Sequence, residues 1–434
     1  MKYLKALLCL FAVSLLFSGC GMTISSSIDD LISPLAPFGE NADIKSALDA
    51  FAQNGYSLKS PSAGDYVTSY NFYDLNGDGV DEAIAFYEPS DNLGSIDLAV
   101  IEKIDGRWTV VENIQGAGTE VSSLHFDDLN GDGTVEIFVC WDAIANSSNH
   151  ELCVYHFEES EDGKALVPLE SAITVNNYIT ADFFNDGEKE LLLLEISTGN
   201  TQSNKAELYS LEDDGLVLLG DTKLDSHVSS YVRLSVETAE DVMRIYADGM
   251  GTDGSSMLTE IIYWSDTYHT IISPFYSYLT GVSEETKRSL PVPSIDVNDD
   301  GLIEIPIDYR MADEEDGISI FDCRIFKHSV LLHSDYVLYC ARDGYVLRLP
   351  EPLVNLIVCD YDDTTHELTL IDSDTKQPIC SLMPVLKATY SADKYPNYSV
   401  IHEENGYCFL ALQGSDGELA LSPSDLENMI KVIE

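Results

Sequence analysis

The sequence predicts an all-β protein, a β-propeller with blades of about 54 residues, of which five are recognisable and up to seven are possible. The first observation is an acidic segment that recurs with starts at Asp74, Asp128, Asp182 and Asp296. The first two intervals are 54 residues each, and the third is 114, close to two such periods. The second observation is a run of β-forming residues after each copy. Repeats of this length in a β-rich chain indicate four-stranded blades arranged around an axis.

The repeated segment has the residue types of a cation-binding turn. Its first copy reads Asp74-Leu-Asn-Gly-Asp-Gly-Val-Asp-Glu82, with oxygen-bearing side chains at positions 1, 3, 5 and 9 and Gly at position 6. The third copy departs at position 3, where Phe184 stands. Hard cations such as calcium take about six to eight oxygen ligands on a tightly curled loop. The spacing therefore predicts calcium-binding loops.

Helical calcium motifs are excluded by position 12 of the segment. An EF-hand needs a bidentate Glu there, between two helices. In this chain position 12 is apolar in every copy: Ala85, Val139, Leu193 and Ile307. Dockerin-type loops are excluded on the same ground, so we expect the loops to connect strands.

A fifth unit emerges from the residues upstream of each loop. Four related tetrapeptides recur there: Val67-Thr-Ser-Tyr70, Val121-Ser-Ser-Leu124, Val175-Asn-Asn-Tyr178 and Val228-Ser-Ser-Tyr231. The last of these is followed by Ser235, Ala239 and Met243 where the ligand positions 1, 5 and 9 fall. We therefore expect the unit over 228–288 to keep its strands and to bind no metal.

Over about residues 62–340 these strand-flanked acidic loops resemble the FG-GAP or VCBS repeats of integrin α-subunit propellers. The resemblance implies that calcium is structural and sits within each blade. It also implies a set of ligands, with a weakened site in the third copy: Asp74, Asn76, Asp78 and Glu82; Asp128, Asn130, Asp132 and Glu136; Asp182, Asp186 and Glu190; Asp296, Asn298, Asp300 and Glu304.

Residues 1–19 have the features of a signal peptide. A basic start precedes the apolar segment 6–17, which is too short to span a bilayer. The sequence Leu16-Phe-Ser-Gly-Cys20 resembles the lipobox of bacterial lipoproteins, although Phe17 stands where Leu is usual. Cleavage before Cys20 leaves a diacylglycerol on its thiol, which anchors the chain to the outside of the membrane. The alternative is an ordinary secretory signal with a chance cysteine.

Residues 20–40 are expected to be a tether, and residues 41–61 a helix with a lead-in to the first blade. Apolar residues at Ile44, Leu48 and Phe51 share one helical face. Asn41 is the expected N-cap and Gly55 the expected stop.

The composition limits the partners of the exported part. The chain has 23 basic and 75 acidic residues, a formal net charge of −52, which repels nucleic acid and anionic lipid. Seven cysteines remain after the signal and Cys20, without a CxxC pair, so buried free thiols are expected. A disulfide between Cys140 and Cys153 is the alternative.

Residues 341–434 no longer follow the period. We expect a small α+β module there, with two diverged blades as the alternative. The segment Asp360-Tyr-Asp-Asp363 indicates a polar turn between strands, and 422–433 indicates a closing helix capped by Ser422 or Ser424.

A search for catalytic motifs is mostly negative, with no zincin, GxSxG or P-loop pattern. The sequence therefore favours a membrane-anchored surface lipoprotein whose calcium-stabilised propeller is a binding scaffold for an unknown protein or glycan. The alternative is an extracellular enzyme, a glycan-active hydrolase or lyase, with its site in the propeller channel.

Overall fold

The computed structural model describes residues 39–143, 148–160, 163–169, 172–197, 203–212, 215–313, 317–415 and 419–433. Cys20, the expected signal peptide and most of the expected tether lie outside these ranges. None of the helices in the described ranges has the length and apolar character needed to cross a membrane.

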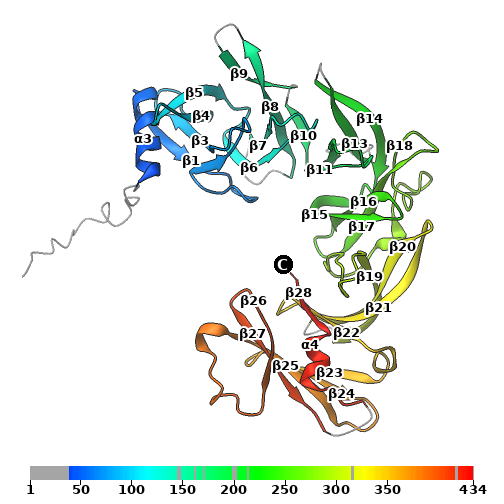
Figure 1. Cartoon of the computed structure of the whole chain (residues 1–434). Helices are drawn as coiled ribbons and strands as arrows, with labels where there is room; N and C mark the ends of the chain where they lie inside the picture. The colour runs from blue at the N-terminus through cyan, green and yellow to red at the C-terminus, as the bar shows by residue number, and fades with distance from the viewer. Residues whose placement is uncertain are drawn as a thin grey trace, which may run out of the picture.

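The described strands form six antiparallel sheets that follow one another in chain order. Figure 1 shows them along an arc that stays open between the first sheet, at β1, and the last, at β26. Most sheets are built from consecutive antiparallel strands, as propeller blades are. The predicted all-β fold with repeated blades is confirmed, and six sheets lie between the five recognisable units and the upper limit of seven.

The first two sheets contain the first two acidic loops. In each, the loop joins two paired strands, β2 to β3 and β6 to β7. The strands are β1 (Tyr56–Lys59), β2 (Tyr70–Tyr73), β3 (Glu82–Pro89), β4 (Asp97–Ile104) and β5 (Arg107–Gln115), then β6 (Glu120–Asp127), β7 (Glu136–Asp142), β8 (His150–Ser160), β9 (Gly163–Pro168) and β10 (Ile173–Val175).

The third and fourth sheets have four strands each, in the orders β11-β12-β13-β14 and β15-β16-β17-β18. The third contains an acidic loop between β11 and β12, whereas β15 and β16 of the fourth form a hairpin. Their bounds are β11 (Asn177–Ala181), β12 (Glu190–Glu195), β13 (Asn204–Glu212), β14 (Gly215–Leu224), β15 (Val228–Ala239), β16 (Val242–Gly251), β17 (Met257–Ser265) and β18 (Thr270–Ile272). The expectation that the unit over 228–288 keeps its strands is confirmed.

The fifth and sixth sheets hold the rest of the chain, in the orders β19-β20-β21-β22-β28 and β23-β24-β25-β27-β26. Three short 3-10 helices, η1 (Glu284–Thr286), η2 (Glu351–Leu353) and η3 (Lys387–Thr389), lie among the connections. The strands are β19 (Glu304–Asp313), β20 (Ile318–Lys327), β21 (Val330–Cys340), β22 (Tyr345–Leu349), β23 (Ile357–Asp362), β24 (Glu367–Asp372), β25 (Pro378–Leu386), β26 (Ser399–Glu404), β27 (Tyr407–Gln413) and β28 (Ile430–Val432).

The fifth sheet continues past residue 340, because β22 and β28 both belong to it. The division into a propeller over 62–340 and a separate module over 341–434 stays a prediction. A polar turn does join the paired strands β23 and β24, but it covers residues 363–366, because Asp360 to Asp362, where it was expected, belong to β23.

The core lies between consecutive sheets. Strands β3 and β7 contain long runs of buried residues, which is typical of strands covered on both faces. Trp141 is fully buried and packs edge-to-face on Phe86 of the first sheet, with ring centroids 5.6 Å apart. Similar apolar clusters join each later pair of neighbouring sheets. Each sheet is therefore stabilised by its neighbours.

The N-terminal helix α3 (Glu40–Phe51) covers the outer face of the first sheet (Figure 1). Ile44 and Leu48 are fully buried in a cluster with residues of β3 and β4, as their helical spacing predicts. The helix begins one residue before the expected cap, behind Gly39, and ends at Phe51. Gly55 lies in the turn that follows, at φ 84.

The expected closing helix over 422–433 is wrong in its second half. Helix α4 (Pro423–Glu427) has a capping box in which Ser422 and Asp425 bond each other's backbone N–H groups. Residues 430–432 then form β28, which pairs with β22. The β-branched residues Ile430 and Val432 favour a strand, and the free edge of β22 provides the partner.

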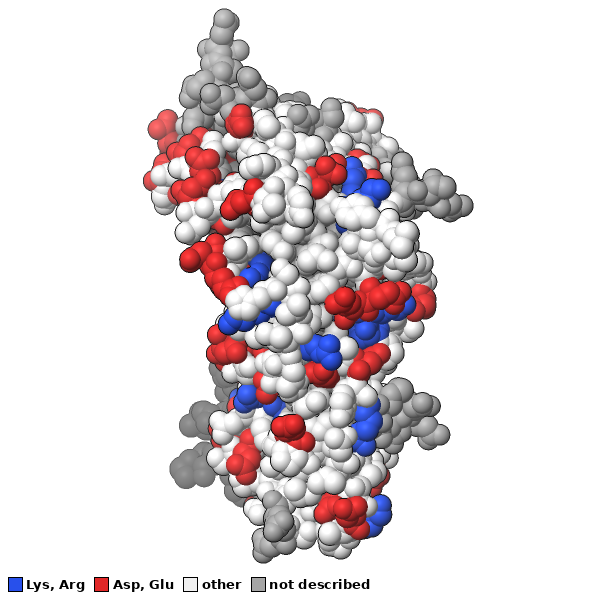
Figure 2. Space-filling view, turned by 90° about the vertical axis from the view of Figure 1, so that its right-hand side faces the viewer, with Lys and Arg blue, Asp and Glu red and all other residues white. Residues whose placement is uncertain are grey.

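The cysteines of the described residues are buried and form no disulfide, including Cys140 and Cys153 on the neighbouring strands β7 and β8. Acidic side chains spread in groups over the face seen in Figure 2, with basic side chains among them. This distribution fits a solvated coat.

Candidate metal loops and a candidate binding groove

In the first acidic loop, side-chain oxygens hold the backbone of the turn. Asp74 accepts hydrogen bonds from the backbone N–H groups of Asp78 (3.1 Å) and Gly79 (2.9 Å). Asn76 Oδ1 also accepts from the Asp78 N–H, at 2.9 Å. Asp78 Oδ1 accepts from the Val80 N–H at 2.8 Å. The acidic residues at positions 1 and 5 thus form the turn that the spacing predicts.

The same two roles recur in the other loops. The residue at position 1 accepts from the Gly N–H at position 6, and the residue at position 5 accepts from the N–H two residues later. The position 1 acceptors are Asp128 (2.9 Å), Asp182 (3.0 Å) and Asp296 (2.8 Å). The position 5 acceptors are Asp132 (2.7 Å), Asp186 (3.1 Å) and Asp300 (2.9 Å).

The third loop keeps this turn although Phe184 replaces the amide at position 3. The ring of Phe184 packs edge-to-face on Trp264 of β17, with centroids 5.1 Å apart. The substitution therefore exchanges a side-chain oxygen for a contact with the next sheet.

The glutamate at position 9 is buried in all four loops and bonds to the backbone. Glu82, Glu136, Glu190 and Glu304 are each at most 4% exposed. Each accepts a hydrogen bond from the N–H of the residue at position 2, at 2.8–2.9 Å. Burial raises the pKa of each of these carboxyls to about 7, and the acidic residues of the same loop add to the effect.

The donors of the intact loops fit a hard cation by their chemistry, since each offers carboxylate and amide oxygens at positions 1, 3 and 5. In the second loop Asp128 Oδ1 is buried and lacks a hydrogen-bond partner within the described residues. A bound cation satisfies such an oxygen. Across the described ranges, however, no three His, Cys, Asp or Glu side chains are grouped as a metal centre.

Neighbouring loops contact one another along one edge of the sheets. The Val135 N–H of the second loop donates to the Leu75 carbonyl of the first at 3.4 Å. The Lys189 N–H of the third loop donates to the Leu129 carbonyl of the second at 2.6 Å. A Cβ on Gly77 of the first loop would lie 3.1 Å from the Gly133 carbonyl, so this approach needs glycine. The first three loops thus form a continuous row.

The fourth sheet has a tight hairpin where its loop would be. Ser235 and Ala239 lie on β15 and Met243 on β16, paired in the strand ladder. Glu237, which is 3% exposed, accepts the Ile303 N–H of the last acidic loop at 2.8 Å. The N–H at position 8 of the last acidic loop thus bonds to the Glu237 carboxylate, whereas in the second and third loops the equivalent N–H bonds to a backbone carbonyl of the preceding loop.

Three cavities lie side by side around the C-terminal strand β28, which points toward the middle of the arc in Figure 1. Their volumes are about 480, 380 and 720 Å³, and all three are lined by Glu404 and Val432. We call them together the C-terminal groove. It runs between the fifth and sixth sheets and reaches β15 of the fourth sheet at Arg233 and Ser235.

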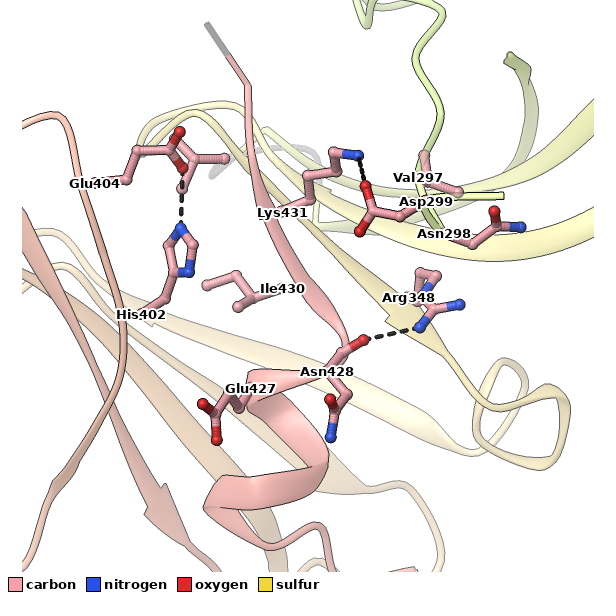
Figure 3. Close-up of a pocket in the computed structure, with 11 residues that line it drawn as sticks. Val297, Asn298, Asp299, Arg348, His402, Glu404, Glu427, Asn428, Ile430 and Lys431 are labelled. Atoms are coloured by element: carbon pink, nitrogen blue, oxygen red, sulfur yellow. Dashed lines mark hydrogen bonds and ion pairs between the residues drawn. The ribbon is translucent and has the colours of Figure 1, made fainter. Parts of the chain in front are cut away.

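One wall of the groove is fixed by the last acidic loop (Figure 3). Lys431 Nζ donates to the Asp296 carbonyl and, at 2.7 Å, to Asp299 Oδ1. This ammonium lowers the pKa of Asp299. Arg348 donates to the Asn428 carbonyl at 2.8 Å. On the opposite wall, His402 Nε2 and Glu404 Oε2 lie 2.9 Å apart.

The largest cavity ends at a buried carboxylate. The Asp343 side chain is 5% exposed and lies 2.7 Å from His366 Nδ1. It also accepts a hydrogen bond from the Tyr361 hydroxyl at 3.0 Å. The imidazole of His366 is 52% exposed and lines the cavity, and its Nδ1 is the nitrogen that faces Asp343.

Little in the sequence indicates this groove. Most of its residues come from the C-terminal part of the chain, which carries no repeat, and the others belong to the last acidic loop and to β15. Only the β-branched run Ile430-Lys-Val-Ile433 could have indicated the strand at its centre.

Comparisons with known proteins add little to this description. No family model matches the chain, and no curated protein matches it either. Three solved structures are similar to it: the exotype rhamnogalacturonan lyase YesX (14% identity, TM-score 0.29, 74% of this chain and 64% of that one), the Dos1 propeller (9%, 0.33, 82% and 80%) and the Bacillus licheniformis rhamnogalacturonan lyase PL11 (14%, 0.28, 74% and 71%). The match to YesX thus spans less than two thirds of that enzyme. Likeness at these identities and scores supports no inference on activity.

Proposed function

We propose that this chain is an exported binding protein, attached to a bacterial membrane through lipid on Cys20 and stabilised by calcium in its acidic loops. Its ligand occupies the C-terminal groove. The observation that carries the proposal is the adjacency of three cavities around β28, of about 480, 380 and 720 Å³. Cavities of about 300–1,000 Å³ with a few polar groups on their walls are typical ligand sites.

The acidic loops have a structural role in this proposal. Their carboxylates bond to their own backbone, and three of the loops bond to one another in a row. Calcium bound by these residues would offset the repulsion between the carboxylates of one loop. The fourth loop forms part of the groove wall through Asn298 and Asp299, and Lys431 of β28 bonds to it.

Site-specific photo-crosslinking in the producing cell tests the proposal. A photoreactive amino acid at Asn405, in the turn that lines the largest cavity, should give a crosslinked adduct on the cell surface. The matched control carries the photoreactive amino acid in place of Tyr268, which is 70% exposed on the turn after β17. Equal yields at the two positions, or no adduct at Asn405, would contradict binding in the groove.

The second candidate function is a glycan-active enzyme, and one observation favours it. Asp343 holds the Nδ1 of His366 at 2.7 Å, which is how a carboxylate orients an imidazole for proton transfer. Turnover of a polysaccharide by the purified protein, lost in His366→Ala, would select this alternative.

A further inference from the structure

The largest cavity of the groove combines apolar surface with neutral hydrogen-bonding groups. Its volume is about 720 Å³. The side chains of Leu386 and Tyr407, on the paired strands β25 and β27, are 50% and 40% exposed. These large apolar groups at the cavity wall are partly exposed to water, so a ligand that covers them gains binding free energy from the burial of apolar surface.

The charged groups at this cavity are already paired within the protein. Arg342 forms an ion pair with Asp363, and the buried Asp343 carboxylate bonds to His366 and Tyr361. Glu404 is bonded to His402. A charged ligand would have to displace one of these partners, whereas a neutral one need not.

The remaining polar groups are side-chain hydrogen-bonding groups on turns around the rim. They include the Nε2 edge of His366 and the amide of Asn405, whereas the Thr389 hydroxyl already donates to the Leu386 carbonyl at 3.0 Å. Such groups match the hydroxyl rim of a sugar ring, and the exposed Tyr407 ring and Leu386 match its apolar C–H face.

Strand addition by a peptide is disfavoured at this wall. The backbone of β25 over 383–386 is paired with β27, with Pro384 opposite Phe409. Proline lacks the N–H that a strand ladder requires. Recognition at this wall therefore depends on side chains more than on backbone groups.

From these observations we infer that the largest cavity binds a short, neutral oligosaccharide, with Tyr407 stacking on a sugar ring and with Asn405 and His366 bonding its hydroxyls. The inference rests on the proposed function, because it assigns the ligand class of the same groove.

Calorimetric titration of the full-length protein tests the ligand class. The probes are xylohexaose, mannohexaose and cellohexaose, with hexagalacturonate as an acidic probe and a casein digest as a peptide probe. We expect a neutral hexasaccharide to bind, and Tyr407→Ala to weaken its binding at least about tenfold, whereas Tyr407→Phe retains most of it. Tyr268→Ala, which removes an exposed tyrosine remote from the cavity, should leave the affinity within about twofold.

Several outcomes would overturn the inference. They are the absence of binding by all three neutral sugars, tighter binding of hexagalacturonate, or sugar binding that is the same in wild type, Tyr407→Ala and Asn405→Ala. Peptide binding that depends on Tyr407 would overturn the sugar class but leave the groove as a binding site. The crosslinking at Asn405 tests separately whether the groove binds a ligand at all.

Discussion

The backbone N–H of Ile303 donates to the carboxylate of Glu237 at 2.8 Å, across 66 residues of sequence. The same carboxylate accepts from Arg244 Nη1 at 2.9 Å and from the Tyr246 hydroxyl at 3.1 Å. Glu237 thus joins the fourth sheet, which has no acidic loop, to the loop that begins the fifth.

Glu237→Ala should destabilise the protein strongly. It leaves Arg244, whose side chain is 6% exposed, without its buried partner, and a broken buried pair costs about 3–5 kcal/mol. Urea unfolding measures the loss. Glu240→Ala is the control, because the Glu240 side chain is 44% exposed and approaches Arg244 only at 3.4 Å. Equal effects of the two substitutions would show that the buried pair and the Ile303 bond stabilise the protein no more than the exposed Glu240 does.

Cys20→Ala should release the protein from the membrane fraction, because the thiol that carries the lipid is lost. Labelled fatty acid should be incorporated by the wild type and not by the variant. A wild-type protein without label would contradict lipid anchoring.

Lys431→Met should loosen β28 without unfolding the sheets. The substitution removes the bonds to Asp296 and Asp299, which tie this strand to the last acidic loop. Hydrogen exchange should become faster over 430–432 and stay unchanged in β3. Lys394→Met is the control, since Lys394 is exposed and its ammonium lies 5.9 Å from the Tyr395 ring. Unchanged exchange in Lys431→Met would show that pairing with β22 alone holds the strand.

In metal-free protein, Glu136→Gln should alter the dependence of stability on pH. Burial raises the pKa of Glu136 to about 7 in the folded state, above the ordinary value of 4.5. The folded state therefore binds more protons between these two values, and this residue's contribution to stability falls as the pH rises toward 7. Each unit of difference corresponds to about 1.4 kcal/mol. Gln resembles the protonated acid and does not titrate, so the variant should not lose this contribution to stability as the pH rises.

Denaturant unfolding at pH 5.5 and pH 7.5 in excess chelator measures this effect. The free energy of unfolding of the variant relative to the wild type should increase from pH 5.5 to pH 7.5. A constant difference would contradict the raised pKa.

The acidic loops could be predicted from the sequence because the hydrogen bonds that form each turn are local. Asp74, Asn76 and Asp78 lie within five residues, so spacing alone determines the turn. The role of Glu82 was harder to predict from the sequence, since the burial of its side chain depends on how the sheets pack. Phe184 could be recognised as a departure, but its contact with Trp264 could not.

The groove could not be predicted, because its residues meet only in three dimensions. Lys431 and Asp296 are 135 positions apart. The apolar spacing of Leu426, Met429 and Ile430 fits a helix as well as a turn followed by a strand. Pairing with β22 decided between the two, and local propensity does not contain that information.

Chelation of calcium should lower the thermal stability of the protein. A cation that binds only the folded state contributes RT ln(1 + [L]/Kd), about 2.7 kcal/mol per site at a hundredfold excess over Kd. Extracellular calcium modules often have dissociation constants on the order of 0.1–1 mM, so the gain per site is smaller at millimolar calcium. Scanning calorimetry with millimolar calcium and with excess chelator measures the difference.

Two matched substitutions assign this effect to individual loops. Asp132→Ala should remove part of the sensitivity to chelator, because the second loop has its full set of oxygens and Asp128 Oδ1 stands buried without a partner among the described residues. Asp186→Ala should remove less, since Phe184 has already replaced one oxygen of the third loop. Both residues accept an equivalent backbone N–H, at 2.7 Å and 3.1 Å, so loss of the turn itself affects the two variants alike. Identical melting with calcium and with chelator would mean that the loops are turns held by hydrogen bonds alone.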